Sequence, residues 1–385
     1  MGILLVLAAF AVAHGPRVVR NLPKPHWEDT RHFRHNRDQI HSLADVFRKP
    51  SAWPGGAEAT YRPLSGNLYY LAGRVLFANR LEAYHVVGAV TYVLNGVLLL
   101  LLSRRLLPDP WSMLPPVLFV SRLAHMQVIT YTSEFDGLSY VTFGLLGLLC
   151  LIDEGGSTLR ARDALAAGAF GLAVLCKEAA IVWPAVVATY AWLFRRPRAW
   201  RRFLGAFALV GVWAMAYPFI IRRLYDGTRP AFAIDLRPTA LLTCYGAYLI
   251  SFLNPLVPDV DPEKAGWAMP PRVVALAESP AMLLATAASI AVLVLAVVLV
   301  RVRPPALSAP TRVAALGFAW FVMATAPFAV LADRLFMRYS YAGHAGLALC
   351  VGGLAAGVAQ RWRARRSSTA DAPRPRLDNP SPAEV

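Results

Sequence analysis

Charged residues and cysteines are both scarce in this sequence. Only 16% of the 385 residues are charged, whereas 57% are hydrophobic, which leaves too little charge for an ordinary soluble surface. The 4 cysteines lie in or beside apolar runs and show neither CxxC nor zinc-ligand spacing. We therefore interpret them as small residues of a membrane core rather than as a disulfide framework. We find no internal repeat and expect no soluble C-terminal domain.

The formal net charge of +16 would suit a nucleic-acid binder, but the distribution of the charge favours another interpretation. The basic residues cluster in short loops between apolar runs. This is the pattern expected when positive charge is retained on the cytoplasmic side of a membrane. The sequence thus predicts a lipid bilayer as partner and no nucleic acid.

The recurring apolar runs predict an all-α, polytopic helical membrane protein with about ten spans. If the loops alternate between the two sides, all five arginine-rich segments fall on one side, which we take as the cytoplasm. We expect an integral protein of a bacterial cytoplasmic membrane whose active site faces outward. The spans after the first are predicted at 84–103, 112–127, 137–152, 164–176, 179–194, 203–221, 281–300, 313–331 and 340–360.

Two apolar segments need separate treatment. The first run, 2–13, has only 12 residues, fewer than the roughly 20 that span a bilayer. It lacks the basic n-region of a cleaved signal peptide, so a signal anchor or a start codon placed too late fits better. Residues 239–257 would reverse every later loop if they crossed the membrane, so we expect a re-entrant or surface helix there.

These assignments divide the chain into a membrane domain and a tail. The tail is rich in Pro, Ser, Ala and Asp, a composition typical of disorder. The first outer loop should end in an amphipathic helix near 68–76, where apolar residues recur at helical spacing. The expected parts are the membrane domain 1–361, its outer segments 14–83 and 222–280, and the disordered cytoplasmic tail 362–385.

Four motifs stand in order among the predicted spans. They are His-Trp-Glu-Asp at 26–29, Tyr-Arg-Pro-Leu at 61–64, Lys-Glu at 177–178 and Arg-Tyr-Ser-Tyr at 338–341. Together they resemble the GT-C superfamily of membrane glycosyltransferases, above all the membrane part of the tetratricopeptide-repeat O-mannosyltransferases and their bacterial relatives. The chain departs from that pattern in its Glu-Asp pair, in its lack of the repeats and at Glu134, where a basic residue is common.

The resemblance implies transfer of a sugar from a polyprenyl-phosphate-linked donor to a hydroxyl of a lipid, glycan or protein acceptor. Such a displacement needs a base for the acceptor proton and cations for the departing phosphate. Asp29 is the expected base, with Glu28 as its neighbour or alternate. The competing interpretation is a solvated loop acid beside Arg31 and Arg34.

The expected phosphate ligands are Lys177, Arg338, Arg62 and Tyr339. Three of them have a structural alternative: an internal ion pair for Lys177 with Glu178, snorkelling for Arg62 and an interfacial aromatic belt for Tyr339.

Sugar or acceptor contacts are expected from Asp136, His125 and Glu178, with Glu178 also orienting Lys177. Asp136 has a helix-capping alternative. No metal-ligand spacing is evident, so the sequence predicts no certain cofactor and leaves a divalent cation open. The rival functions are a lipid-linked-sugar flippase or secondary transporter and a non-catalytic member of the fold.

Overall fold

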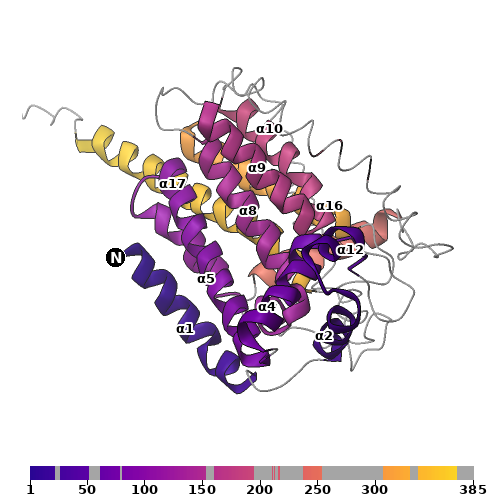
Figure 1. Ribbon diagram of the computed structural model, residues 1–385. Helices are drawn as coiled ribbons and strands as arrows, with labels where there is room; N and C mark the ends of the chain where they lie inside the picture. Colours follow the sequence, from indigo (N-terminus) through magenta and orange to yellow (C-terminus); the bar gives the residue numbers. More distant parts are fainter. Residues whose placement is uncertain are drawn as a thin grey trace, which may run out of the picture.

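The computed structural model describes residues 1–21, 27–51, 61–78, 80–152, 160–194, 237–253, 307–329 and 337–370, with single positions at 210, 212 and 216. Within these ranges the secondary structure is entirely helical (Figure 1). Several sequence predictions lie outside these ranges. They concern the span 203–221, apart from the three single positions, the span 281–300, the arginines of 195–202 and most of the outer segment 222–280.

The chain folds into long helices joined by short 3-10 and π turns. In order these are α1 (Gly2–Asn21), α2 (Trp27–Gln39), α3 (Leu43–Arg48), η1 (Pro63–Leu68), α4 (Tyr69–Phe77), α5 (Leu81–Leu106), η2 (Trp111–Met113), α6 (Leu114–Val120), η3 (Leu123–His125), α7 (Met126–Thr130), η4 (Thr132–Glu134), α8 (Phe135–Leu151), α9 (Arg160–Cys176), η5 (Glu178–Val182), α10 (Trp183–Leu193), α12 (Pro238–Leu253), α16 (Ala309–Ala329), η7 (Met337–Ser340) and α17 (Tyr341–Ala370).

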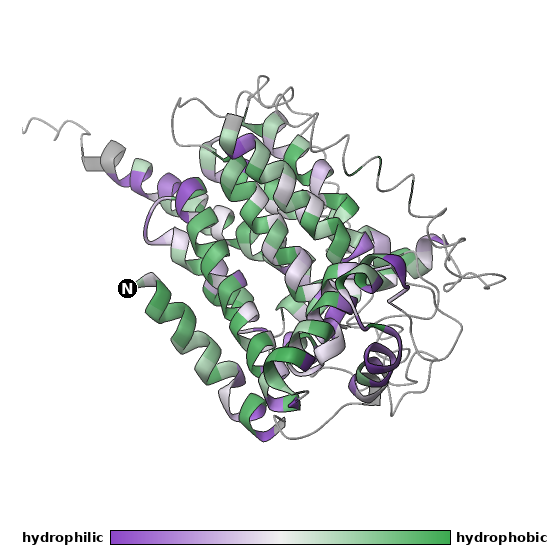
Figure 2. Cartoon of the chain, viewed as in Figure 1, coloured by the Kyte–Doolittle hydropathy of each residue, from purple (hydrophilic) through white to green (hydrophobic). Residues whose placement is uncertain are grey.

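Five segments of the described chain are long and apolar enough to cross a bilayer, which indicates an integral membrane protein. Hydrophobic residues cover most of the bundle in Figure 2, whereas α2 and the projecting end of α17 are hydrophilic. The all-α class is thus supported, and the count of ten spans stays a prediction. The five segments are Gly2–Arg20, Leu81–Leu106, Thr132–Leu151, Ala309–Ala329 and Arg338–Arg366.

The first apolar segment is longer than the sequence suggested. Helix α1 continues through Pro16 to Asn21 and has 20 residues, so the outer loop does not begin at residue 14. Packing explains the difference, because His14 is fully buried and its Nδ1 lies 3.2 Å from Met126 Sδ. Tertiary contacts therefore accommodate a polar residue that had marked the end of the apolar run.

The predicted span 112–127 is wrong as a continuous helix. It is divided into α6, η3 and α7, and the backbone is extended at Arg122. The buried guanidinium of Arg122 donates to Leu118 O at 2.9 Å and to Phe252 O at 2.5 Å. An arginine can be buried here because it satisfies carbonyl groups near the ends of two helices, α6 and α12.

The C-terminal hairpin of α16 and α17 packs very closely. A Cβ atom placed on Gly317 would lie 2.4 Å from Gly346 O, and one on Gly346 would lie 2.6 Å from Gly317 O. Small residues allow the backbones of two membrane helices to approach this closely. The pair supports a core in which Trp183 of α10 meets Trp320 of α16, with ring centroids 5.2 Å apart.

Two further sequence predictions have clear outcomes. The amphipathic helix exists as α4, which buries Tyr69 and Tyr70 and leaves Val75 and Leu76 exposed. The disordered tail was placed too early, because α17 continues to Ala370 and projects from the bundle (Figure 1). Alanine, glutamine and arginine are strong helix formers, so the helix extends beyond its apolar part. Residues 371–385 lie outside the described ranges.

Candidate functional site

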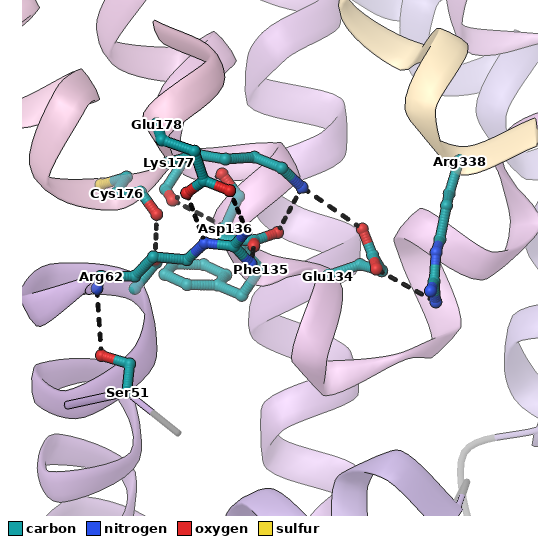
Figure 3. A network of polar contacts seen from close by, with 11 residues as sticks. Ser51, Arg62, Glu134, Phe135, Asp136, Cys176, Lys177, Glu178 and Arg338 are labelled. Atoms are coloured by element: carbon teal, nitrogen blue, oxygen red, sulfur yellow. Dashed lines mark hydrogen bonds and ion pairs between the residues drawn. The ribbon is translucent and has the colours of Figure 1, made fainter. Parts of the chain in front are cut away.

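Two buried carboxylates stand at the start of α8. Glu134 closes the 3-10 turn η4, and Asp136 belongs to the first turn of α8. Arg62, just before η1, reaches both Asp136 and Glu178 (Figure 3). It clasps Glu178 with two donors, one of them Nε at 2.8 Å from Oε2. Such a two-point contact fixes orientation as well as charge.

Lys177 and Arg338 complete this charged network from distant parts of the chain. Lys177 Nζ lies 3.0 Å from Asp136 Oδ1 and 3.8 Å from Glu134 Oε2. Arg338 Nη1 lies 3.1 Å from Glu134 Oε1. Figure 3 shows Glu134 between the two cations. Lys177 and Arg338, both expected as phosphate ligands, thus lie close together, and Glu134 is the residue that joins them.

Among the described residues the network contains three cations and three carboxylates: Arg62, Lys177 and Arg338 against Glu134, Asp136 and Glu178. Burial lowers the pKa of Lys177, but Asp136 and Glu134 together raise it above its ordinary value. Burial raises the pKa of Glu178, but Arg62 holds it below its ordinary value. Both groups at the elbow between α9 and η5 are therefore charged at neutral pH.

The position of Glu178 corrects one expectation. The sequence predicted that Glu178 orients Lys177, but its hydrogen-bonded partner is Arg62. Lys177 is oriented instead by Asp136 and Glu134. Its backbone is extended at the end of α9, so consecutive side chains at 177 and 178 point to different partners.

Tyr339 belongs to the site rather than to a distant aromatic belt. Its ring lies 5.7 Å from Lys177 Nζ and 5.6 Å from Arg338 Cζ. It also stacks on Phe328, with ring centroids 4.6 Å apart. The two aromatic faces cover the cations and contribute cation–π attraction.

Asp29 of α2 is fully buried, so the interpretation as a solvated loop acid is wrong. Its Oδ1 accepts hydrogen bonds from the backbone N and the hydroxyl of Thr132, at 2.9 and 2.8 Å. Its Oδ2 lies 4.0 Å from His85 Nε2. Because Thr132 begins η4, Asp29 braces the turn that carries Glu134. Glu28 also belongs to α2, and its side chain is outside the described set.

His125 turns into the core instead of toward Asp136. Its Nδ1 lies 2.8 Å from Tyr92 Oη and its Nε2 lies 2.9 Å from His344 Nδ1. His344 Nε2 faces Tyr248 O at 3.0 Å, and a carbonyl only accepts, so the proton of His344 sits on Nε2. His125 then donates from Nε2, and its Nδ1 faces the hydroxyl of Tyr92, which also lies 3.2 Å from Phe119 O. This chain of hydrogen bonds ties α5, η3, α17 and α12 together.

An apolar cavity of about 480 Å³ adjoins the charged network. Its lining includes Phe135, between Glu134 and Asp136 in the chain, and Cys176, next to Lys177. Leu64, two residues after Arg62, lines another side. Ser65 fixes this wall by donating to Cys176 O at 2.5 Å. A chain-like apolar group in the cavity would therefore lie beside the charges.

The bundle separates this network from the surface arginines. Helices α9, α16 and α17 each have one end beside the network, near Lys177, Phe328 and Arg338 respectively. Arginines lie at or near the far ends of these helices and at the end of α5, where Arg105 donates to Ile152 O at 2.8 Å. The side of the membrane on which these arginines lie stays a prediction. The far-end arginines in the described chain are Arg104, Arg105, Arg160, Arg162, Arg312, Arg361, Arg363, Arg365 and Arg366.

Sequence reasoning noted Glu134 only as a departure from the family pattern, and it missed Thr132 and Ser51. Ser51 Oγ accepts from the backbone N of Arg62 at 3.1 Å and so fixes the start of η1. The available signal for Glu134 was its place two residues before Asp136 at the start of a span. Among the described residues there is no cluster of three or more His, Cys, Asp or Glu that would hold a metal ion. The possibility of a divalent cation stays open.

Comparison with protein-family models, with curated proteins and with solved structures finds no match to this chain. The likeness to the GT-C superfamily therefore stays a prediction from the motifs. What the structure adds is their arrangement: an all-helical bundle with long apolar segments, in which Arg62, Asp136, Lys177 and Arg338 meet at one end.

Proposed function

We propose that this chain is a membrane glycosyltransferase that takes its sugar from a polyprenyl-phosphate-linked donor and transfers it to a hydroxyl acceptor at the outer face. The main support is the approach of Lys177 and Arg338 to one small region, where each lies within 4 Å of Glu134. Ionisable groups buried among the helices of a membrane protein usually mark a pathway or a reaction site.

The donor would be amphiphilic, and the site offers both kinds of surface. Lys177 and Arg338 would bind the phosphate and stabilise the charge that it gains as the glycosidic bond breaks. The prenyl chain would enter the neighbouring apolar cavity of about 480 Å³. Tyr339, stacked beside both cations, would exclude water from the phosphate.

Asp29 is the proposed base. In a single displacement, the acceptor oxygen would bond to the anomeric carbon, its proton would pass to Asp29, and the phosphate would leave with the electrons of the broken bond. Thr132 would hold the carboxylate in place through Oδ1. The proposal directs Oδ2, on the side of His85, toward the acceptor. Movement of α2 would be needed to admit the acceptor, because Asp29 is fully buried.

The test is sugar transfer by purified protein in liposomes, with a panel of radiolabelled polyprenyl-phosphate sugars. Asp29→Asn should lower turnover by roughly two orders of magnitude, because it removes the base and keeps the shape. Thr132→Val is the matched control, since it removes only the hydroxyl that holds Oδ1. We expect it to lower turnover by less than about tenfold.

If the two variants lose activity equally, Asp29 acts only through the turn that it braces. If wild-type protein moves the labelled lipid across the bilayer without transferring sugar, the chain is a transporter. If the protein neither transfers sugar nor moves the labelled lipid with any donor, the result favours a non-catalytic member of the fold.

A further inference from the structure

Glu134 holds the position that a bound phosphate would need. We infer that Glu134 is a built-in competitor for this anion site: its carboxylate pairs with Lys177 and Arg338 in the resting protein, and the donor phosphate must displace it. The inference rests on the proposed function, because it concerns how that donor enters.

The geometry of the Glu134 carboxylate carries the argument. One oxygen faces Arg338 Nη1 at 3.1 Å, and the other faces Lys177 Nζ at 3.8 Å. Two oxygens of one anion thus bridge two cations from separate segments, as two phosphate oxygens would. The longer contact is beyond hydrogen-bond distance, so Lys177 is held more closely by Asp136 at 3.0 Å.

The two carboxylates of this turn therefore have different roles. Asp136 contacts both Arg62 and Lys177 by hydrogen bonds and keeps Lys177 in place. Glu134 supplies the remaining negative charge between Lys177 and Arg338. Loss of the contacts to Glu134 would release both cations for a ligand while Asp136 still orients one of them.

Charge balance gives the class of ligand. Among the described residues the network holds three cations and three carboxylates. A phosphodiester carries one negative charge, so exchanging it for Glu134 keeps these six charges in balance.

Movement of the side chain does not require the turn to unfold. Asp29 fixes the backbone N and the hydroxyl of Thr132 at the start of η4. Gly137, one turn along α8, faces Glu134 and Lys177: a Cβ atom placed on Gly137 would lie 3.6 Å from Glu134 Oε2. Rotation of the Glu134 side chain about its own bonds is the motion that we infer.

Binding of farnesyl methyl phosphate, a phosphodiester, to the purified full chain in nanodiscs tests this inference by titration calorimetry. Glu134→Gln should bind at least about tenfold more tightly than wild type, which corresponds to about 1.4 kcal/mol. Glu82→Gln is the control, because it removes an exposed carboxylate in the first turn of α5 that does not belong to the charged network. Its affinity should change by less than about threefold, because an exposed charge is screened by solvent.

Glu134→Asp is a second variant, which retains the negative charge. Its binding is measured in case the Glu134→Gln variant does not fold. Its shorter side chain withdraws the carboxylate from the cations, so it should also bind more tightly than wild type. Equal affinity of the wild-type and Glu134 variants would overturn the competitor and leave the phosphate site intact. Absence of binding by all of them, with folding retained, would overturn the phosphate site and the proposed function with it.

Discussion

Removal of the Lys177 ammonium is the perturbation that tests the charged network most directly. The side chain is 5% exposed and pairs with Asp136 at 3.0 Å and Glu134 at 3.8 Å. Lys177→Met keeps most of the apolar stem but leaves two buried carboxylates with one cation fewer. Breaking a buried pair in this way costs about 3–5 kcal/mol, chiefly because the remaining charge is buried without compensation.

The assay measures the free energy of reversible unfolding of the purified protein in mixed detergent micelles. A second measurement is the midpoint temperature of thermal unfolding. The midpoint should fall by about 10 °C. Lys49→Met is the control: Lys49 pairs with Asp45 at 3.4 Å, and its side chain is 36% exposed. An exposed pair of this kind contributes less than about 1 kcal/mol.

A double-mutant cycle separates the network from ordinary packing. Lys177→Met combined with Asp136→Asn should cost less than the sum of the two single changes, by at least about 1 kcal/mol, because the second change removes the uncompensated charge. If Lys177→Met unfolds like wild type, the attraction within the network does no more than offset the cost of burying it. The stabilising role assigned to these pairs would then be wrong.

Three other predictions concern pH, packing and topology. The pKa of Glu178 in the folded protein is depressed beside Arg62, so the contribution of Glu178 to stability is present at neutral pH and is lost as the pH falls below the ordinary glutamate range. Thermal unfolding of wild type and Glu178→Gln as a function of pH measures this loss. Parallel pH profiles of the two proteins would contradict it. Gly346→Val should prevent correct packing of α16 on α17, since even one Cβ atom would lie 2.6 Å from a carbonyl oxygen of the facing helix. Gel filtration and thermal unfolding would detect the loss of packing, with Leu354→Val at an exposed site as control. Single cysteines at the exposed positions of His41 and Arg366 should be labelled from opposite sides of the membrane, and labelling of both from one side would refute the orientation.

The sequence by itself determined the local and periodic features. Apolar runs predicted α5, α8, α16 and α17, because a helix that crosses a bilayer must satisfy its backbone internally and present apolar side chains to lipid. The basic loops predicted an orientation in the membrane, which stays a prediction. The motifs also predicted that Lys177 and Arg338 belong to one site, although not that Glu134 contacts both of them.

Only the tertiary structure decided which partners these residues have. Glu178 follows Lys177 in the chain but pairs with Arg62, because the extended backbone at the elbow directs the two side chains apart. Glu134 contacts Lys177, 43 positions along the chain, and Arg338, 204 positions along it, and no local pattern encodes either contact. The break at Arg122 and the burial of Asp29 have the same origin. A polar side chain in an apolar surrounding is tolerated where a distant segment supplies its hydrogen bonds, and only folding brings that segment near.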